Sequence, residues 1–163
     1  MFDLDNENWP LPSNQFDWIR AKDVFEHLEN PVNFIEEVYR VAKPGATVII
    51  QGPHFSSSNW HDPTHKRLLG SRSFDNYTEE ADFHFYSNTR FKTISTEIRF
   101  GPFKKQPHKI LGKRLANQFT GLYEETFLRN LFPARDIRFK LKAVKDTSGS
   151  TSGGYPSRQE GSE

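Results

Sequence analysis

The feature that most constrains the fold is an alternation of strand-like and helix-like segments within residues 16–51. Residues 16–21, FDWIRA, are short and rich in apolar and aromatic side chains, which predicts a strand. A helix is predicted next, starting at Asn30-Pro31 and stopped at Lys43-Pro44-Gly45, with an apolar face formed by Val32, Ile35, Val38, Tyr39 and Ala42. Residues 46–51, ATVIIQ, are almost wholly apolar, as in parallel strands that are buried on both faces. The order predicts a βαβ unit.

The rest of the chain has weaker patterns. Residues 52–78 are polar and irregular, which is typical of an active-site loop or a lid. Strands are predicted at 91–100 and 137–143, and helical spacing runs through 108–131. The Ser/Gly-rich end of the chain has no periodicity, so residues 147–163 are expected to be a disordered tail after one domain at 1–146.

Composition narrows the class of protein. The 163 residues suit one domain, and the net charge of +1 gives no overall attraction to nucleic acid or membrane. A basic stretch with few aromatic neighbours contains Lys104, Lys105, His108, Lys109, Lys113 and Arg114, so a solvated face is favoured over RNA binding. The absence of cysteine, of a long apolar run and of a basic N-terminal region predicts a cytoplasmic protein without a signal peptide or membrane span.

Several short words in the N-terminal half occur in an informative order. An acidic residue, Asp3, is followed by the turn Trp9-Pro10-Leu11 and the strand opening SNQFD at 13–17. VFEHL at 24–28 and EVYRVAKPGA at 37–46 come next, and then PHFSS at 53–57 and DPTH at 62–65. In this order, the words resemble the class I S-adenosylmethionine-dependent methyltransferases, in particular those of type 11.

This resemblance implies an α/β fold: a partial Rossmann-like methyltransferase sheet, made of the βαβ unit and a C-terminal antiparallel strand pair. It implies S-adenosylmethionine as the cofactor and methyl transfer to an unidentified acceptor. Asp3 would accept a hydrogen bond from the adenine amino group, and the backbone at Ala21 and Lys22 would contact the methionine part. The first glycine is Gly45, so the family's glycine-rich cofactor loop has no counterpart here, and a truncated form is expected.

The densest group of candidate catalytic side chains lies in the polar segment, at His54, His61, Asp62 and His65. One histidine could serve as a general base that removes a proton from the acceptor, since imidazole titrates near neutrality. Imidazole and carboxylate could also bind a metal, although Pro63 argues against the helix that an H-x-x-x-H site needs. The third interpretation is a loop in which Asp62 and Thr64 satisfy its own backbone. The catalytic hypothesis is placed on His54, His61 and His65, and no metal ligand is assigned.

Asp23, directly before the VFEHL word, and Glu26 and His27 within it also have structural interpretations. Asp23 and Glu26 have the spacing of a helix-capping box, and His27 could either pack or face the cleft.

Two other functions remain open. One is a non-catalytic interaction module that keeps the same fold and pairs with another chain, or with itself, through an exposed sheet edge. The other is a small metal-dependent enzyme built on the His/Asp loop.

Overall fold

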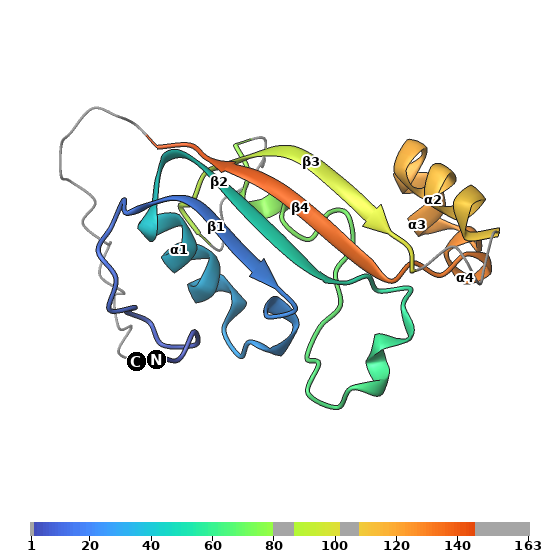
Figure 1. Ribbon diagram of the computed structural model, residues 1–163, viewed down its shortest axis with the longest axis horizontal. Coiled ribbons are helices and arrows are strands. Elements are labelled where there is room, and N and C mark those ends of the chain that lie inside the picture. The colour runs from blue at the N-terminus through green and yellow to red at the C-terminus, as the bar shows by residue number, and fades with distance from the viewer. Residues whose placement is uncertain (1, 80–86, 102–107, 146–163) are drawn as a thin grey trace, which may run out of the picture.

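The computed structural model describes residues 2–79, 87–101 and 108–145. Within these ranges the chain forms a four-stranded mixed sheet with the strand order β1-β2-β4-β3 (Figure 1). Its strands are β1 (Phe16–Lys22), β2 (Ala42–Pro53), β3 (Phe91–Arg99) and β4 (Asp136–Ala143). β1 is parallel to β2, whereas β4 is antiparallel to both β2 and β3. The predicted α/β class, with a βαβ unit and a closing antiparallel pair, is confirmed.

The crossover helix α1 (Pro31–Val41) begins where the sequence predicts. The Asn30 side chain accepts a hydrogen bond from the Asn33 backbone N–H, and Pro31 occupies the first turn. The helix ends at Val41 and passes directly into β2, so the Lys43–Gly45 stop lies inside a strand. Gly45 has φ of 77°, a conformation that glycine adopts without strain.

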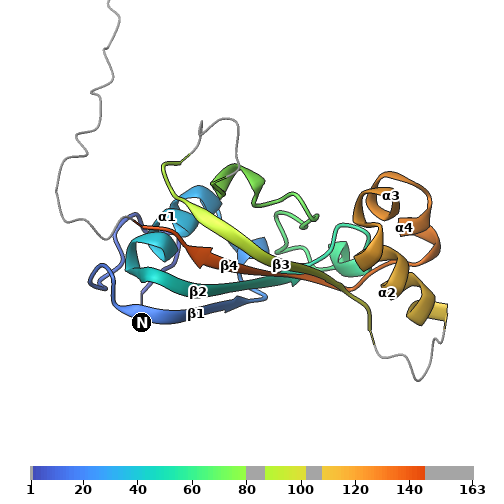
Figure 2. The same cartoon turned by 90° about the horizontal axis from the view of Figure 1, so that it is seen from above.

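One face of the sheet carries the core. Alternate β2 and β4 residues are buried there, and Phe139 packs edge-on against Phe74 with ring centroids 4.7 Å apart. In Figure 2, α1 and the segment that follows β2 lie on this side of the sheet. On the opposite face, Thr47 and Ile49 are only half-buried, so the predicted burial of β2 on both faces is wrong. Among the described residues, α1 covers the core face only.

The sheet has two edge strands, β1 and β3, and β3 has an isolated bridge between Phe91 and Thr78, whereas β1 is the more open of the two among the described residues. The partner of β1 on one side is β2, and among the described residues it has none on the other. Trp18 is 54% exposed on this strand. Pairing with another chain at this edge stays a prediction.

The helical pattern over 108–131 is divided into three helices: α2 (His108–Gln118), α3 (Thr120–Glu125) and α4 (Leu128–Leu131). They gather beyond the end of β3 (Figure 1). The breaks fall at Phe119 and Thr126, whose backbones leave the helical region. The Asn117 side chain joins α2 to β3, because it accepts from the Ile98 N–H and donates to the Ile98 carbonyl, both at 2.8 Å.

Several predicted features fall partly or wholly outside the described ranges. The tail at 147–163 does, and so do Lys104 and Lys105 of the basic stretch. Lys113, from the same stretch, lies 3.7 Å from the Glu97 carboxylate. In the parts of the chain that the structure describes, no helix is long and apolar enough to cross a membrane.

Candidate functional site

The candidate site lies where the two parallel strands end. β1 pairs with β2 up to Lys22 and Gln51, and the Asp23 N–H then donates to the Gln51 carbonyl at 2.9 Å. β2 continues to Pro53, which pairs with Asp136 at the start of β4. Because ligands of open α/β sheets bind outside the carboxyl ends of parallel strands, this edge is the expected position of a cofactor or substrate.

A cavity of about 460 Å³ opens at this edge. The turn after β1, the start of β4 and the polar loop after β2 form its wall. The lining residues are Asp23, Glu26, His27, Pro53, Ser58, Asn59, His61, Asp62, His65, Arg135 and Asp136. Most of these side chains are polar or ionisable, which favours a polar ligand over an apolar one.

The turn after β1 differs from its prediction. Asp23 has φ of 53°, and its carboxylate lies 2.9 Å from the Lys22 ammonium. The following 3₁₀ turn, Phe25–His27, has Val24 at its cap and no side-chain capping bond. The predicted capping box is therefore wrong, because the left-handed turn at Asp23 ends the strand before a helix can start.

Backbone hydrogen bonds hold the polar loop against this turn. The Leu69 N–H donates to the Pro53 carbonyl, and the Phe55 N–H donates to the Leu69 carbonyl, both at 2.9 Å. The Lys66 N–H donates to the Glu26 carbonyl at 2.8 Å. These bonds return the loop to β2 and place His65 beside His27, with ring centroids 4.7 Å apart.

A short hydrogen-bond chain orders the His27 ring. The Thr64 hydroxyl donates to the Asp62 carboxylate at 2.6 Å and lies 3.0 Å from His27 Nδ1. The Thr64 backbone N–H also donates to Asp62, at 2.9 Å. Hydrogen bonds from Thr64 hold the pKa of the Asp62 carboxyl below its ordinary value. Asp62 and Thr64 do satisfy their own loop, as the structural interpretation predicted, and they also support a cavity-lining histidine.

The pKa values of two other carboxyls of the cavity are shifted in the opposite direction. Burial raises the pKa of Glu26 and of Asp136 above their ordinary values. Glu26 is only 1% exposed. Arg135 lies 3.8 Å from Asp136 and opposes the effect of burial there.

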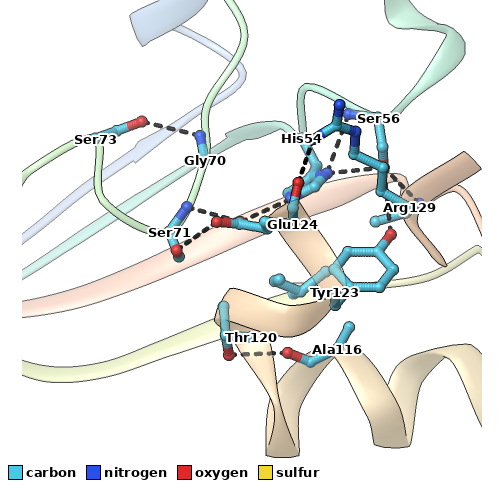
Figure 3. A network of polar contacts seen from close by, with 12 residues as sticks. His54, Ser56, Gly70, Ser71, Ser73, Ala116, Thr120, Tyr123, Glu124 and Arg129 are labelled. Carbon is cyan, nitrogen blue, oxygen red and sulfur yellow. Dashed lines mark hydrogen bonds and ion pairs between the residues drawn. The ribbon is translucent and has the colours of Figure 1, made fainter. Parts of the chain in front are cut away.

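His54 lies elsewhere, in a buried polar network with α3 (Figure 3). Its Nε2 is 3.0 Å from Glu124 Oε1, and its Nδ1 is 2.9 Å from the Ser56 hydroxyl. Glu124 also accepts from the Ser71 N–H and hydroxyl. Burial alone would raise the pKa of Glu124, but the hydrogen bonds from His54 and Ser71 lower it overall. This network joins the end of β2 to α3.

The structure thus brings together two of the three predicted catalytic histidines. His61 and His65 line the cavity, whereas His54 is fully buried and does not. Ala21 and Lys22 are the last residues of β1, directly before the cavity wall begins at Asp23. Asp3 is exposed in the N-terminal segment, where its carboxylate accepts the Asp5 N–H at 3.0 Å, and it is not part of the wall. The roles given to these residues stay predictions.

Sequence reasoning missed several residues of the wall. Glu26 was assigned to a cap, and Arg135 and Asp136 were not considered. The available signal was the strand pattern. Asp136 directly precedes the last predicted strand, 137–143, and the antiparallel pairing of that strand with β2 places Asp136 beside Pro53. Among the described residues, Glu26, His27 and His65 also form a group with a spacing that could hold a metal ion.

Comparison with known proteins finds methyltransferase-like matches in sequence and in fold. Residues 2–50 match a family described as a methyltransferase domain. A candidate methyltransferase from Bacillus halodurans C-125 is 17% identical, with a TM-score of 0.50 over 88% of this chain and 70% of that one. The YcgJ protein from Bacillus subtilis is 16% identical, with a TM-score of 0.50 over 86% of this chain and 69% of its own.

A third structure with the same TM-score of 0.50 is the [4+2]-cyclase SpnF, which is 16% identical over 88% of this chain. The chain spans 54% of the length of that protein. Identities this low show a shared fold. A cyclase among the neighbours means that the fold by itself does not fix the reaction.

Proposed function

The chain carries part of a class I methyltransferase fold, and from this premise we propose that it binds S-adenosylmethionine and transfers its methyl group to a polar acceptor. The observation that carries the proposal is the polar cavity at the carboxyl ends of β1 and β2. Three of its lining residues, Asp23, Glu26 and His27, lie in the stretch 2–50 that matches the methyltransferase-domain family. The cofactor would lie against Ala21 and Lys22, and the acceptor would occupy the cavity beyond Asp23.

Methyl transfer from a sulfonium is a direct displacement, so alignment of the donor and the nucleophile is the protein's main contribution. A general base is needed only when the nucleophile arrives protonated. His61 and His65 are the candidates for that role, because both line the cavity. His54 is better suited to hold the loop, since both of its ring nitrogens have partners.

The test is a calorimetric titration of the folded chain with S-adenosylhomocysteine. We expect one site per chain. The Asp3→Ala variant should bind roughly 10- to 150-fold more weakly, because a hydrogen bond to a charged group contributes about 1.5–3 kcal/mol. Glu7→Ala is the matched control, since Glu7 is another exposed acid of the same segment, and its affinity should be unchanged.

The outcomes separate the alternatives. If wild type binds and Asp3→Ala binds equally well, the proposed cofactor stands, but Asp3 does not belong to its binding site. A folded chain that does not bind would favour the interaction module, for which the exposed β1 edge is the supporting observation.

A further inference from the structure

A buried carboxylate and two imidazoles converge on one wall of the cavity. Glu26, His27 and His65 each offer one ligand atom, and these atoms all lie within 4.8 Å of one another. The planes of the two imidazole rings are inclined at 64°, so the rings are not stacked face to face. Glu26 and His27 come from the turn after β1, and His65 comes from the loop after β2.

The hydrogen bonds of the two histidines use the same nitrogen, Nδ1, on each ring, and His65 Nε2 lies 3.7 Å from the Asp62 carboxylate. His65 Nδ1 lies 2.8 Å from the Asn59 carbonyl, which can only accept, so this nitrogen carries the proton. The Thr64 hydroxyl gives its proton to Asp62, so its oxygen accepts from His27 Nδ1. In the neutral rings, both Nε2 atoms therefore present lone pairs. Donation from Nδ1 to a carbonyl or a carboxylate-linked group is the usual support of a metal-binding histidine.

The third member of the group is the Glu26 carboxylate, which is buried. Glu26 Oε2 is buried and has no hydrogen-bond partner among the described residues. The groups that favour the ionised form of this carboxyl are the Glu26 backbone N–H and the imidazoles of His27 and His65, and no lysine or arginine is among them. Leaving a buried carboxylate oxygen unpaired is unfavourable, and a bound cation would satisfy it.

We propose that Glu26, His27 and His65 bind a divalent transition-metal ion whose remaining positions open into the cavity. Two imidazoles and one carboxylate suit Zn²⁺ or Fe²⁺, whereas Mg²⁺ and Ca²⁺ prefer oxygen ligands throughout. Zn–N bonds of about 2.05 Å place the two ligating nitrogens roughly 3.3 Å apart, which is within the 4.8 Å that encloses the ligand atoms of the group. Neither imidazole is fully buried, and the His65 side chain is 11% exposed.

The site is independent of the proposed methyl transfer. When His65 binds metal through Nε2, His61 is the remaining imidazole on the cavity wall and the candidate base.

The experiment uses the full chain, stripped of metal with a chelator and titrated with ZnCl₂ in competition with a chromophoric chelator. Wild type should bind one zinc per chain, and excess Mg²⁺ should not compete. Glu26→Gln and His65→Ala should each weaken binding by about 100-fold or more, since each removes one of three ligands. His61→Ala is the matched control, because it removes a histidine from the same loop and cavity, and it should bind as wild type does.

Two further measurements keep the test decisive if a ligand variant folds poorly. Thr64→Val removes the acceptor of the His27 proton and should weaken zinc binding by roughly 10- to 100-fold. At the same zinc concentration, the melting temperature should rise in wild type and rise much less in Glu26→Gln, because stabilisation depends on the ratio of ligand concentration to Kd. The proposal is overturned if wild type binds no stoichiometric zinc, or if His61→Ala loses as much affinity as His65→Ala.

Discussion

The buried Glu26 carboxyl leads to a specific prediction about the stability of the metal-free chain. Its carboxyl is 1% exposed, and Oε2 lacks a partner among the described residues. Burial raises its pKa above the ordinary value of 4.5. Between that value and its folded pKa, the folded state holds the proton that the unfolded state releases, so stability falls as pH rises through this window. Neutral pH lies above 4.5, so this loss of stability is present there.

Glu26→Gln removes this charge with almost no change in shape. An unsatisfied buried polar group costs about 1–3 kcal/mol, and more when charged, but the glutamine amide also needs partners. We therefore expect the variant to be more stable than wild type by roughly 1–2 kcal/mol at pH 7. Near pH 4, where the carboxyl is neutral in both states, the difference should disappear.

The assay is urea unfolding at pH 7 and near pH 4, with a chelator present and the midpoints compared at a common slope. Glu7→Gln is the control, because Glu7 is exposed, and it should change stability by less than about 0.5 kcal/mol. The reasoning is refuted if Glu26→Gln is less stable than wild type at pH 7, or if its gain is the same at both pH values.

Two further predictions concern the packing of α2 and α3. Glu124→Gln should cost about 1–3 kcal/mol at pH 7 in urea unfolding. Hydrogen bonds lower the pKa of Glu124, so the ionised carboxylate stabilises the folded chain above pH 4.5, and this stabilisation is lost as pH falls through the folded-state pKa. A stability loss in Glu124→Gln that is the same at every pH would contradict this. Gly112→Ala would place a Cβ 2.6 Å from Phe132 Cβ, so it should destabilise by about 1–3 kcal/mol in thermal unfolding despite alanine's higher helix propensity, and a stabilised variant would disprove that contact.

The βαβ unit was predictable because its signals are local. Asn30 and Pro31 specify the start of α1 through neighbouring backbone groups, and the apolar run after Gly45 specifies β2. Burial of β2 on both faces was not decided locally, because it depends on which elements cover the second face of the sheet.

The site was only half predictable for the same reason. His54 and His65 belong to the same polar segment and look alike in sequence. His54 turns inward because its partner, Glu124, comes from a helix 70 residues away. His65 joins the cavity because the Lys66 N–H bonds the Glu26 carbonyl, another long-range contact. Sequence patterns identified the histidines, and tertiary contacts separated their environments.

The most direct test of the central claim is an amide NMR titration of the isotope-labelled chain with S-adenosylhomocysteine. The account predicts shifts that concentrate at Ala21–Asp23 and Gln51–Gly52, where the parallel strands end, with little change in β3. Absence of shifts, or shifts confined to α2–α4, would contradict a cofactor site at the carboxyl edge of β1 and β2.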